Sequence, residues 1–541
     1  MSSIHCHFSS SRWQMHELPD GRGHVCGSVW LDGQRLASED ALARLEPVED
    51  HDIWQQRLAH LNGFYALVRQ TTSGVVAAVD RVRSIPLFYG IQGNACYLSD
   101  DADWVRQRVG EVSVDDEAKA DFELAGYVTG RDTLFRRVKQ LRAGEALVVS
   151  DAESAVSLSL ARYYRFQDHV MPTQDDGLGQ ARLEEGVEAA CQRLVEAANG
   201  RQIVVPLSGG YDSRLIATLL ARCRYPRVLT YAYGYRDNQE AKVSREVARA
   251  LGLPWTFVEY SQQAWGRVAD SEPYWRYQQW ASGWNGIANM QDWLAVKQLT
   301  EQGLVEPGSL FAPGHCCVTG FVPPDVFEAR RAGRLMPAGE LGEALRQRHF
   351  MLNTSEEGEA LFAERVLPRL AMDYPLDVPL EPDEFIRWFV QFGWQERQAK
   401  FIVNSVRCFE FFGHDWWMPL YDRDFMYVWQ SLPLHWLEGR AGYVDFVETL
   451  FAEVSGHRAP LGNAAQQSRR SLRARLSRLA ALRRGPGAHL KRMVARLLPG
   501  LAQGNTLAST GRFPPEALER LRSQGYSHNG VAAQLFLERF C

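Results

Sequence analysis

IVVPLSGGYDSRLIATLLARC, residues 203–223, contains a strand signal, a tight turn and a helix signal in immediate succession. Ile203, Val204 and Val205 form an apolar run of the kind found in parallel strands that are buried on both faces. After the turn, apolar side chains from Leu215 to Cys223 recur every three or four residues, which is the spacing of one helix face. This order predicts an α/β unit with the turn at the edge of a parallel sheet.

The turn from Ser208 to Ser213 has the residue types of a phosphate-binding site. Gly209 and Gly210 allow the backbone to approach a ligand closely, and the free N–H groups of a helix start favour an anion. The two serines add hydroxyl donors, and Asp212 is a candidate ligand for the Mg²⁺ that accompanies a triphosphate. The predicted ATP-binding residues of this turn are Leu207, Ser208, Gly209, Gly210, Asp212 and Ser213.

The turn resembles the SGGxDS PP-loop of the ATP pyrophosphatases, enzymes that split ATP between its α and β phosphates. It is not a Walker loop, since no Gly-Lys-Ser/Thr follows. The alternative is an ordinary glycine turn before a helix.

Two further strands, expected at residues 228–233 and 255–260, continue the α/β pattern, with a helix from Glu240 between them. Parallel strands place the loops after Leu207 and Tyr233 on one edge of the sheet. Tyr231, Tyr233 and Gly234 are therefore predicted to flank the adenine. That the two tyrosines are buried strand residues is left open.

Residues 1–165 consist of short alternating segments, which favours a β-rich domain. LNGFYA (61–66), Asp80-Arg81 and PLFY (86–89) resemble the core of the class II glutamine amidotransferase domain that precedes the PP-loop domain in asparagine synthetases. That family uses a cysteine directly after the initiator Met as its nucleophile. Position 2 is Ser2 in this sequence, so hydrolysis of glutamine is not expected, and a serine nucleophile is left as the alternative.

The resemblance implies an α/β protein with three parts. Residues 1–168 are predicted to form an α+β, Ntn-type glutaminase-like β-sandwich. Residues 169–458 would form the PP-loop domain, a parallel sheet with a helical C-terminal part. Residues 459–541 would hold a basic segment and a helical cap.

One loop departs from the family pattern. GHCCVTG (314–320) follows a buried strand, and Gly314 is predicted to line the ATP site. In asparagine synthetases an Asp of this loop holds a second Mg²⁺ on the departing pyrophosphate, and Val318 stands in its place here. Basic side chains would then meet the pyrophosphate charge, or activity would be lost.

Residues 396–433 resemble the LExRxPFLD…LP region that closes the acceptor side of the cleft in asparagine synthetases. Glu410 and Asp422 are the matching carboxylates. Glu410 is predicted to orient the attacking amine, with a salt bridge to Arg407 or Arg397 as the alternative. Asp422 is expected to anchor its loop.

The formal charge of −5 conceals a basic stretch, because no Asp or Glu occurs from Val454 to Pro515. Leucines at helical spacing in 469–496 suit weak contact with an anionic membrane surface. Alternatively, Lys491 of this stretch would act as a catalytic cation that neutralises the pyrophosphate. A third possibility is that residues 469–496 form a solvated segment with neither role. No nucleic-acid module accompanies the charge, so nucleic acid is not expected.

Nine scattered cysteines without zinc spacing, and the lack of a signal or membrane-spanning run, favour a cytoplasmic protein. A homodimer is left open.

The resemblance as a whole implies an ATP- and Mg²⁺-dependent carbon–nitrogen ligase that adenylates a small carboxylate acceptor for attack by an amine or ammonia. SGGYDSR and Phe411-Phe412-Gly413 look most like family members found with surface-polysaccharide genes, which implies a sugar carboxylate as acceptor. Asparagine formation, intramolecular closure as in β-lactam synthetase and lasso-peptide cyclases, and a catalytically silent homologue are the alternatives.

Overall fold

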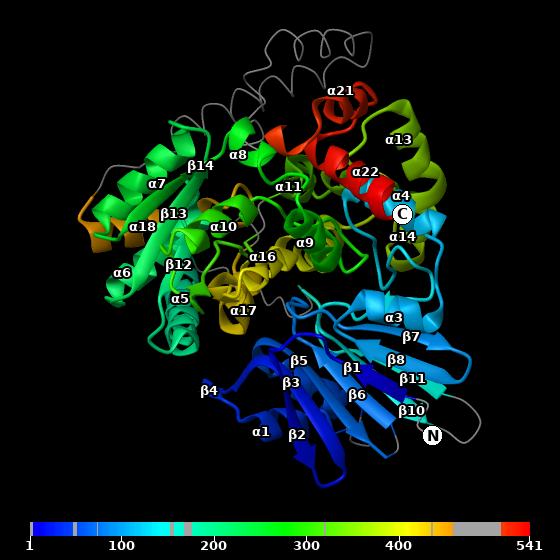
Figure 1. Ribbon diagram of the computed structural model, residues 1–541. Helices are drawn as coiled ribbons and strands as arrows, with labels where there is room; N and C mark the ends of the chain where they lie inside the picture. The colour runs from blue at the N-terminus through cyan, green and yellow to red at the C-terminus, as the bar shows by residue number, and fades with distance from the viewer. Residues whose placement is uncertain are drawn as a thin grey trace.

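The computed structural model describes residues 4–46, 51–72, 74–151, 156–166, 176–318, 321–433, 436–457 and 510–541. Ser2, Lys491 and the basic stretch 469–496 lie outside these residues, so the predictions made on them stay predictions. A β-rich N-terminal part and a larger α/β part meet along a broad contact (Figure 1).

Two sheets form the N-terminal part. The first has the order β1 (Ile4–His7), β8 (Ala95–Ser99), β7 (Phe88–Gln92) and β9 (Lys139–Gln140). The second has the order β11 (Val156–Arg162), β10 (Glu145–Asp151), β6 (Gly74–Val79), β5 (Asn62–Thr71), β3 (Gly21–Leu31) and β2 (Trp13–Leu18), and β4 (Gln34–Arg35) pairs with β3. Residues of both sheets share one apolar core, as predicted for a sandwich. The helices of this part are α1 (Ser38–Ala43), α2 (His51–Ala59), α3 (Ala102–Val109) and α4 (Asp116–Ala125).

The third sheet is parallel throughout. Its order is β14 (Trp255–Glu259), β13 (Val228–Gly234), β12 (Ile203–Pro206), β15 (Leu310–Phe311) and β16 (Asp415–Trp416). The predicted parallel strands are confirmed, and β12, which leads into the glycine turn, is the central one. The turn therefore lies in the middle of the carboxyl edge, where ligands of open α/β sheets bind.

Helices on this sheet fall into two groups. α6 (Tyr211–Arg222), α7 (Gln239–Ala250) and α18 (Ala441–Ser455) contribute to one apolar cluster with Leu207. α10 (Trp293–Glu301) and α16 (Arg407–Phe411) contact each other, and the ring of Phe409 in α16 stacks on Phe311 of β15 at 4.3 Å. α5 (Asp176–Ala198) precedes β12 and packs against α17 (Arg423–Ser431).

A long helical run joins the two parts of the molecule. It starts as α15 (Pro382–Phe392), continues as a π-helix over Gly393–Ile402 and a 3₁₀ turn over Val403–Val406, and ends as α16. The helix expected around residues 396–410 is thus present, with wider π turns up to Ile402 and a tighter 3₁₀ turn after it. Lys400 of this run donates to the carbonyl oxygens of Val128 and Gly130 in the N-terminal part, at 2.6 and 2.7 Å.

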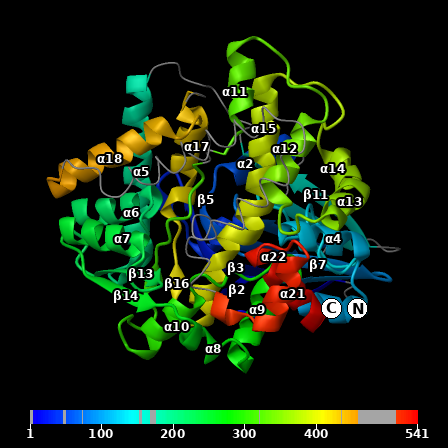
Figure 2. The same cartoon turned by 90° about the horizontal axis from the view of Figure 1, so that it is seen from above.

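The remaining helices complete the α/β part and the C-terminal end. They are α8 (Gln262–Gly266), α9 (Glu272–Ser282), α11 (Pro324–Arg331), α12 (Glu340–His349), α13 (Glu356–Leu361), α14 (Leu367–Asp373), α21 (Pro515–Ser523) and α22 (His528–Phe540). α22 lies beside α4 (Figure 2), and Phe536 shares an apolar cluster with Phe122 and Trp284. Among the described helices, none is long and apolar enough to cross a membrane.

Candidate functional site

The glycine turn after β12 is held in shape by its own serines. The Ser208 N–H donates to Ser213 Oγ at 3.0 Å, and the Gly210 N–H donates to Ser208 Oγ at 3.1 Å. The two hydroxyl oxygens are 3.1 Å apart. Leu207 is buried and its N–H donates to the carbonyl of Tyr231 at 2.8 Å, which ties the turn to β13.

The helix that follows the turn begins without a side-chain cap. Gly210 is the N-cap residue of α6 and, because it has no side chain, it makes no side-chain cap hydrogen bond. The amides of the first turn carry the positive end of the helix dipole and are suited to an anion. Gly314 lies directly against this start, since a Cβ on it would come within 2.7 Å of the Ser213 backbone nitrogen. The predicted residues of the turn and Gly314 are therefore together.

Asp212, in the first turn of α6, faces Arg440, the N-cap residue of α18. Its Oδ2 is 3.6 Å from Nη1 of Arg440, whose side chain is 21% exposed. Its Oδ1 is buried, and no described residue provides it with a hydrogen-bond partner. Burial, and after it the charge of Asp212, raises the pKa of the Tyr443 hydroxyl well above its usual range. A buried carboxylate oxygen without a donor fits a role as a metal ligand.

The donor set for Mg²⁺ is small. Within the described ranges, no three His, Cys, Asp or Glu side chains gather as a metal site does. Val318 is buried, 3% exposed, and its N–H donates to Cys316 Sγ at 3.2 Å. Asp212 fits Mg²⁺ as one ligand among the oxygens of a triphosphate, which is the usual manner in which nucleotide-bound Mg²⁺ is held.

The tyrosines predicted to flank adenine differ in their surroundings. Tyr231 is 0% exposed, and its hydroxyl donates to Asp292 Oδ1 at 2.7 Å. In this structure it is therefore a buried strand residue, which was the alternative to adenine contact. Tyr233 stacks on Tyr260 with ring centroids 4.8 Å apart. Gly234 has a φ of 136° and accepts the Tyr260 N–H at 2.7 Å. Contact of Tyr233 and Gly234 with a base stays a prediction.

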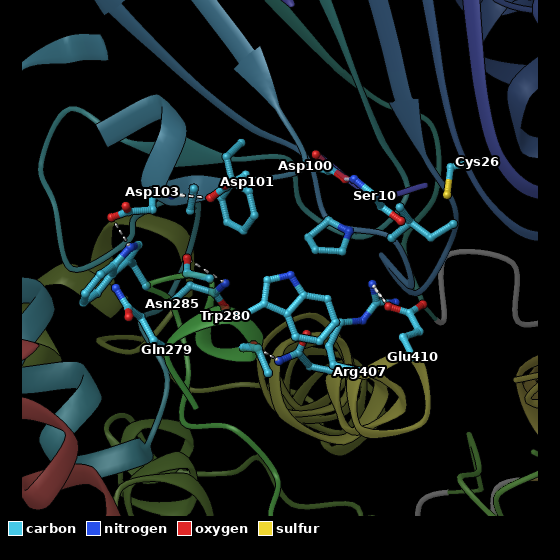
Figure 3. Close-up of a pocket in the computed structure, with 18 of the residues that line it drawn as sticks. Ser10, Cys26, Asp100, Asp101, Asp103, Gln279, Trp280, Asn285, Arg407 and Glu410 are labelled. Atoms are coloured by element: carbon cyan, nitrogen blue, oxygen red, sulfur yellow. Dashed lines mark hydrogen bonds and ion pairs between the residues drawn. The ribbon is translucent and has the colours of Figure 1, made fainter. Parts of the chain in front are cut away.

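A pocket of about 210 Å³ lies where the N-terminal part meets the α/β part. Figure 3 shows Ser10 and Asp100 on one wall, facing Trp280, Arg407 and Glu410 on the other. Both parts of the chain therefore shape the space beside the helical run.

Both carboxylate oxygens of Glu410 in this pocket have partners, two arginines and one indole. Its Oε1 accepts from Arg12 and from the Trp416 indole N–H (2.6 Å), and its Oε2 is 2.7 Å from Arg407 Nη1. The predicted alternative, a salt bridge to Arg407, is present, and Arg397 is not a partner. With both oxygens occupied, Glu410 orients an amine only if one of these pairs opens, so that role stays a prediction.

Asp422 anchors its loop, as expected, and it also contacts the N-terminal part. Arg193 pairs with both of its oxygens at 2.5 and 2.6 Å, and the side chain of Asp422 is 0% exposed. The Asn62 side-chain amide donates to it at 3.2 Å, and its carboxylate caps α17 by accepting the Asp424 N–H at 2.9 Å. Asn62 belongs to the LNGF segment of the N-terminal part.

Sequence reasoning missed the cations of the site. Arg440 precedes α18 in the segment Gly-Arg-Ala-Gly-Tyr, and Arg12 follows three serines near the N-terminus. Neither segment has a motif that predicts its partner. Only the packing of α18 on α6 brings Arg440 to Asp212.

Comparisons with known families agree with this architecture. Residues 183–436 match a family model described as asparagine synthase, and residues 51–164 match one described as glutamine amidotransferase domain. The chain therefore contains an asparagine synthase domain that is preceded by an amidotransferase-type domain. Proteins with this synthase domain are carbon–nitrogen ligases. The resemblance inferred from the sequence is confirmed at this level.

Solved structures give weaker likenesses. Glutamine phosphoribosylpyrophosphate amidotransferase from B. subtilis, complexed with ADP and GMP, is 13% identical over 59% of each chain, with a TM-score of 0.18. A structure described as the allosteric regulatory enzyme of purine biosynthesis is 15% identical over 59% of this chain and 58% of its own, with a TM-score of 0.18. The U34-tRNA thiolase NcsA from Methanococcus maripaludis, with its [4Fe-4S] cluster, is 14% identical over 41% of this chain and 80% of its own, with a TM-score of 0.20.

The chain thus spans less than two thirds of the length of the first two of these proteins. At these TM-scores the three structures say nothing further about this chain. No curated protein matches the sequence significantly.

Proposed function

We propose that the protein makes an amide bond by adenylating a carboxylate with ATP and releasing AMP and pyrophosphate. The observation that carries the proposal is the start of α6, where uncapped amides lie next to Asp212, whose buried Oδ1 has no described donor. The asparagine synthase match over residues 183–436 supports the same reaction class.

Two bond exchanges make up the reaction. An oxygen of the acceptor carboxylate attacks the α-phosphorus of ATP, and the bond to pyrophosphate breaks. An amine nitrogen then attacks the acyl carbon, the C–O bond to AMP breaks, and the nitrogen loses a proton. Adenylation matters because a carboxylate oxygen is a poor leaving group, whereas AMP is a good one.

The residues of this chain bind and align the phosphates. Backbone amides after Leu207 would bind the phosphates, and Asp212 would hold Mg²⁺. When bound, Mg²⁺ neutralises part of the charge on the triphosphate. Arg440 would supply the second cation, which matters because Val318 leaves no second carboxylate for a metal. The rate gain would come from alignment and from charge stabilisation.

The acceptor is proposed to be a sugar carboxylate, such as a uronic acid, or a similar small acid. The support is the resemblance of SGGYDSR and the segment ending in Gly413 to family members found with polysaccharide genes. Ammonia or a free amine is proposed as the nitrogen source, since Ser2 replaces the nucleophilic cysteine of the glutaminases. We also propose that the protein is located in the cytoplasm.

ATP–pyrophosphate exchange with a panel of acids tests this function. Uronic acids, aspartate and short β-amino acids separate the proposed acceptor class from asparagine formation and from intramolecular closure. Exchange is expected with one acid class and is expected to be lost in Asp212→Ala. No exchange with any acid would favour the silent homologue instead.

A further inference from the structure

A second cavity lies away from the glycine turn, where α8 and α9 meet the C-terminal helices. It has a volume of about 330 Å³. None of the residues that line it belongs to the predicted ATP site or to the interdomain pocket of Figure 3. In Figures 1 and 2, α21 and α22 lie on a different side of the molecule from α6.

Arg512 is the main polar feature of this cavity. Its side chain is buried, with the residue 8% exposed, and its Nε has no hydrogen-bond partner among the described residues. Burial lowers the pKa of Arg512, and only the phenol of Tyr274 opposes that effect. A buried cation without a counter-ion is costly, so the absence of a partner calls for an explanation.

A second unpartnered donor lines the same cavity. The Nε2 of Gln278 has no described acceptor, and Gln278 is 6% exposed. Asp270 is the one carboxylate among the lining residues, and it already accepts the Trp275 indole N–H at 2.8 Å. Arg512 and Gln278 thus place two buried polar side chains in the lining, and the neutral hydroxyl of Tyr274 is the group that interacts with both.

The rest of the lining is apolar. The Arg512 guanidinium lies 4.5 Å from the ring centroid of Phe513, which compensates a cation only in part. Trp275, Phe513 and Leu535 provide apolar surface around the two donors. Such a cavity suits a molecule with an anionic head and an apolar body.

We propose that this cavity is a binding site for a small organic carboxylate with an apolar or aromatic body. The carboxylate would accept hydrogen bonds from Arg512 and Gln278, and the body would lie against Trp275 and Phe513. A carboxylate matches a guanidinium in charge and geometry. The proposal is independent of the proposed ligase activity.

Thermal unfolding of the full chain tests the proposal, with benzoate as the probe, benzamide as its neutral analogue and inorganic phosphate as a purely polar anion. At millimolar concentrations benzoate is expected to raise the Tm of the wild type by about 2–4 °C and benzamide to leave it unchanged. The rise is expected to vanish in Arg512→Met and to shrink in Gln278→Leu. Arg520→Met is the matched control, because Arg520 is an exposed arginine of α21 that pairs with Glu538.

Two further results decide the question. Without ligand, Arg512→Met is expected to be no less stable than Arg520→Met, because it removes an uncompensated buried charge. Equal benzoate shifts in wild type and Arg512→Met would overturn the proposal. So would stabilisation by phosphate alone, or a large loss of Tm in ligand-free Arg512→Met, which would show a structural arginine.

Discussion

Replacement of Arg440 by Met tests whether the cation beside the glycine turn serves the nucleotide. Arg440 has a φ of 61°, a left-handed conformation that non-glycine residues rarely adopt, and it directs its guanidinium to within 3.6 Å of Asp212. Burial acts to lower its pKa, but Asp212 opposes this and holds the pKa above its usual value. The guanidinium is therefore charged at neutral pH and lies beside the amides that would hold the phosphates.

The expected loss of affinity follows from this geometry. A hydrogen bond to a charged group contributes about 1.5–3 kcal/mol. Because the Arg440 side chain is 21% exposed, we expect its contribution to lie below the upper end of this range. Its removal also leaves the charge of Asp212 unopposed next to a polyanion. We expect a net loss of about 2 kcal/mol, which corresponds to a KM for ATP raised about 30-fold.

ATP–pyrophosphate exchange measures this effect directly. The KM values for ATP and for pyrophosphate are expected to rise together in Arg440→Met, and Arg440→Lys is expected to recover part of the loss. Arg222→Met is the control, because Arg222 lies at the other end of α6 and pairs with Glu184 and Glu188. Unchanged KM values in Arg440→Met, with normal folding, would refute the reasoning.

Three further variants test the surroundings of the site. Burial raises the pKa of Asp292 to about 6 from 3.8, so the folded protein binds more protons than the unfolded chain between these values, and Asp292 lowers stability as pH rises through that window. In urea unfolding, the stability of Asp292→Asn should therefore gain about 2 kcal/mol relative to wild type from pH 4 to pH 7, and a constant difference would contradict this. Tyr231→Phe should lose about 2 kcal/mol of stability while the KM for ATP changes less than about twofold; a tenfold rise would instead show contact with the nucleotide. Asp422→Asn should lower the urea midpoint by an amount equivalent to about 3 kcal/mol, since Arg193 keeps only Asp424 as a charged partner; an unchanged midpoint would show that this ion pair does not stabilise the packing of α5 on α17.

The sequence was sufficient to predict the parallel sheet and the glycine turn, because both depend on local patterns. The apolar run at Ile203 and the helical spacing after Leu215 determine the strand and the helix on their own. β5 and β6, in which Ala66 pairs with Val79, are likewise neighbouring apolar segments joined by a short turn.

The partners of the site could not be predicted, because they come from distant parts of the chain. Arg440 reaches Asp212 across more than two hundred residues, and Arg12 reaches Glu410 across nearly four hundred. The residues that flank an arginine in the sequence do not predict which carboxylate it will pair with. The same reason explains Tyr231, whose hydroxyl donates to Asp292 from a different segment.

Hydrogen exchange of the backbone amides, measured with and without Mg²⁺ and α,β-methylene-ATP, tests the central claim most directly. The account predicts slower exchange in peptides that cover residues 208–213, at the turn and the first turn of α6, and a smaller effect in Asp212→Ala. Binding of the analogue that leaves these amides unprotected, or no binding at all, would contradict it.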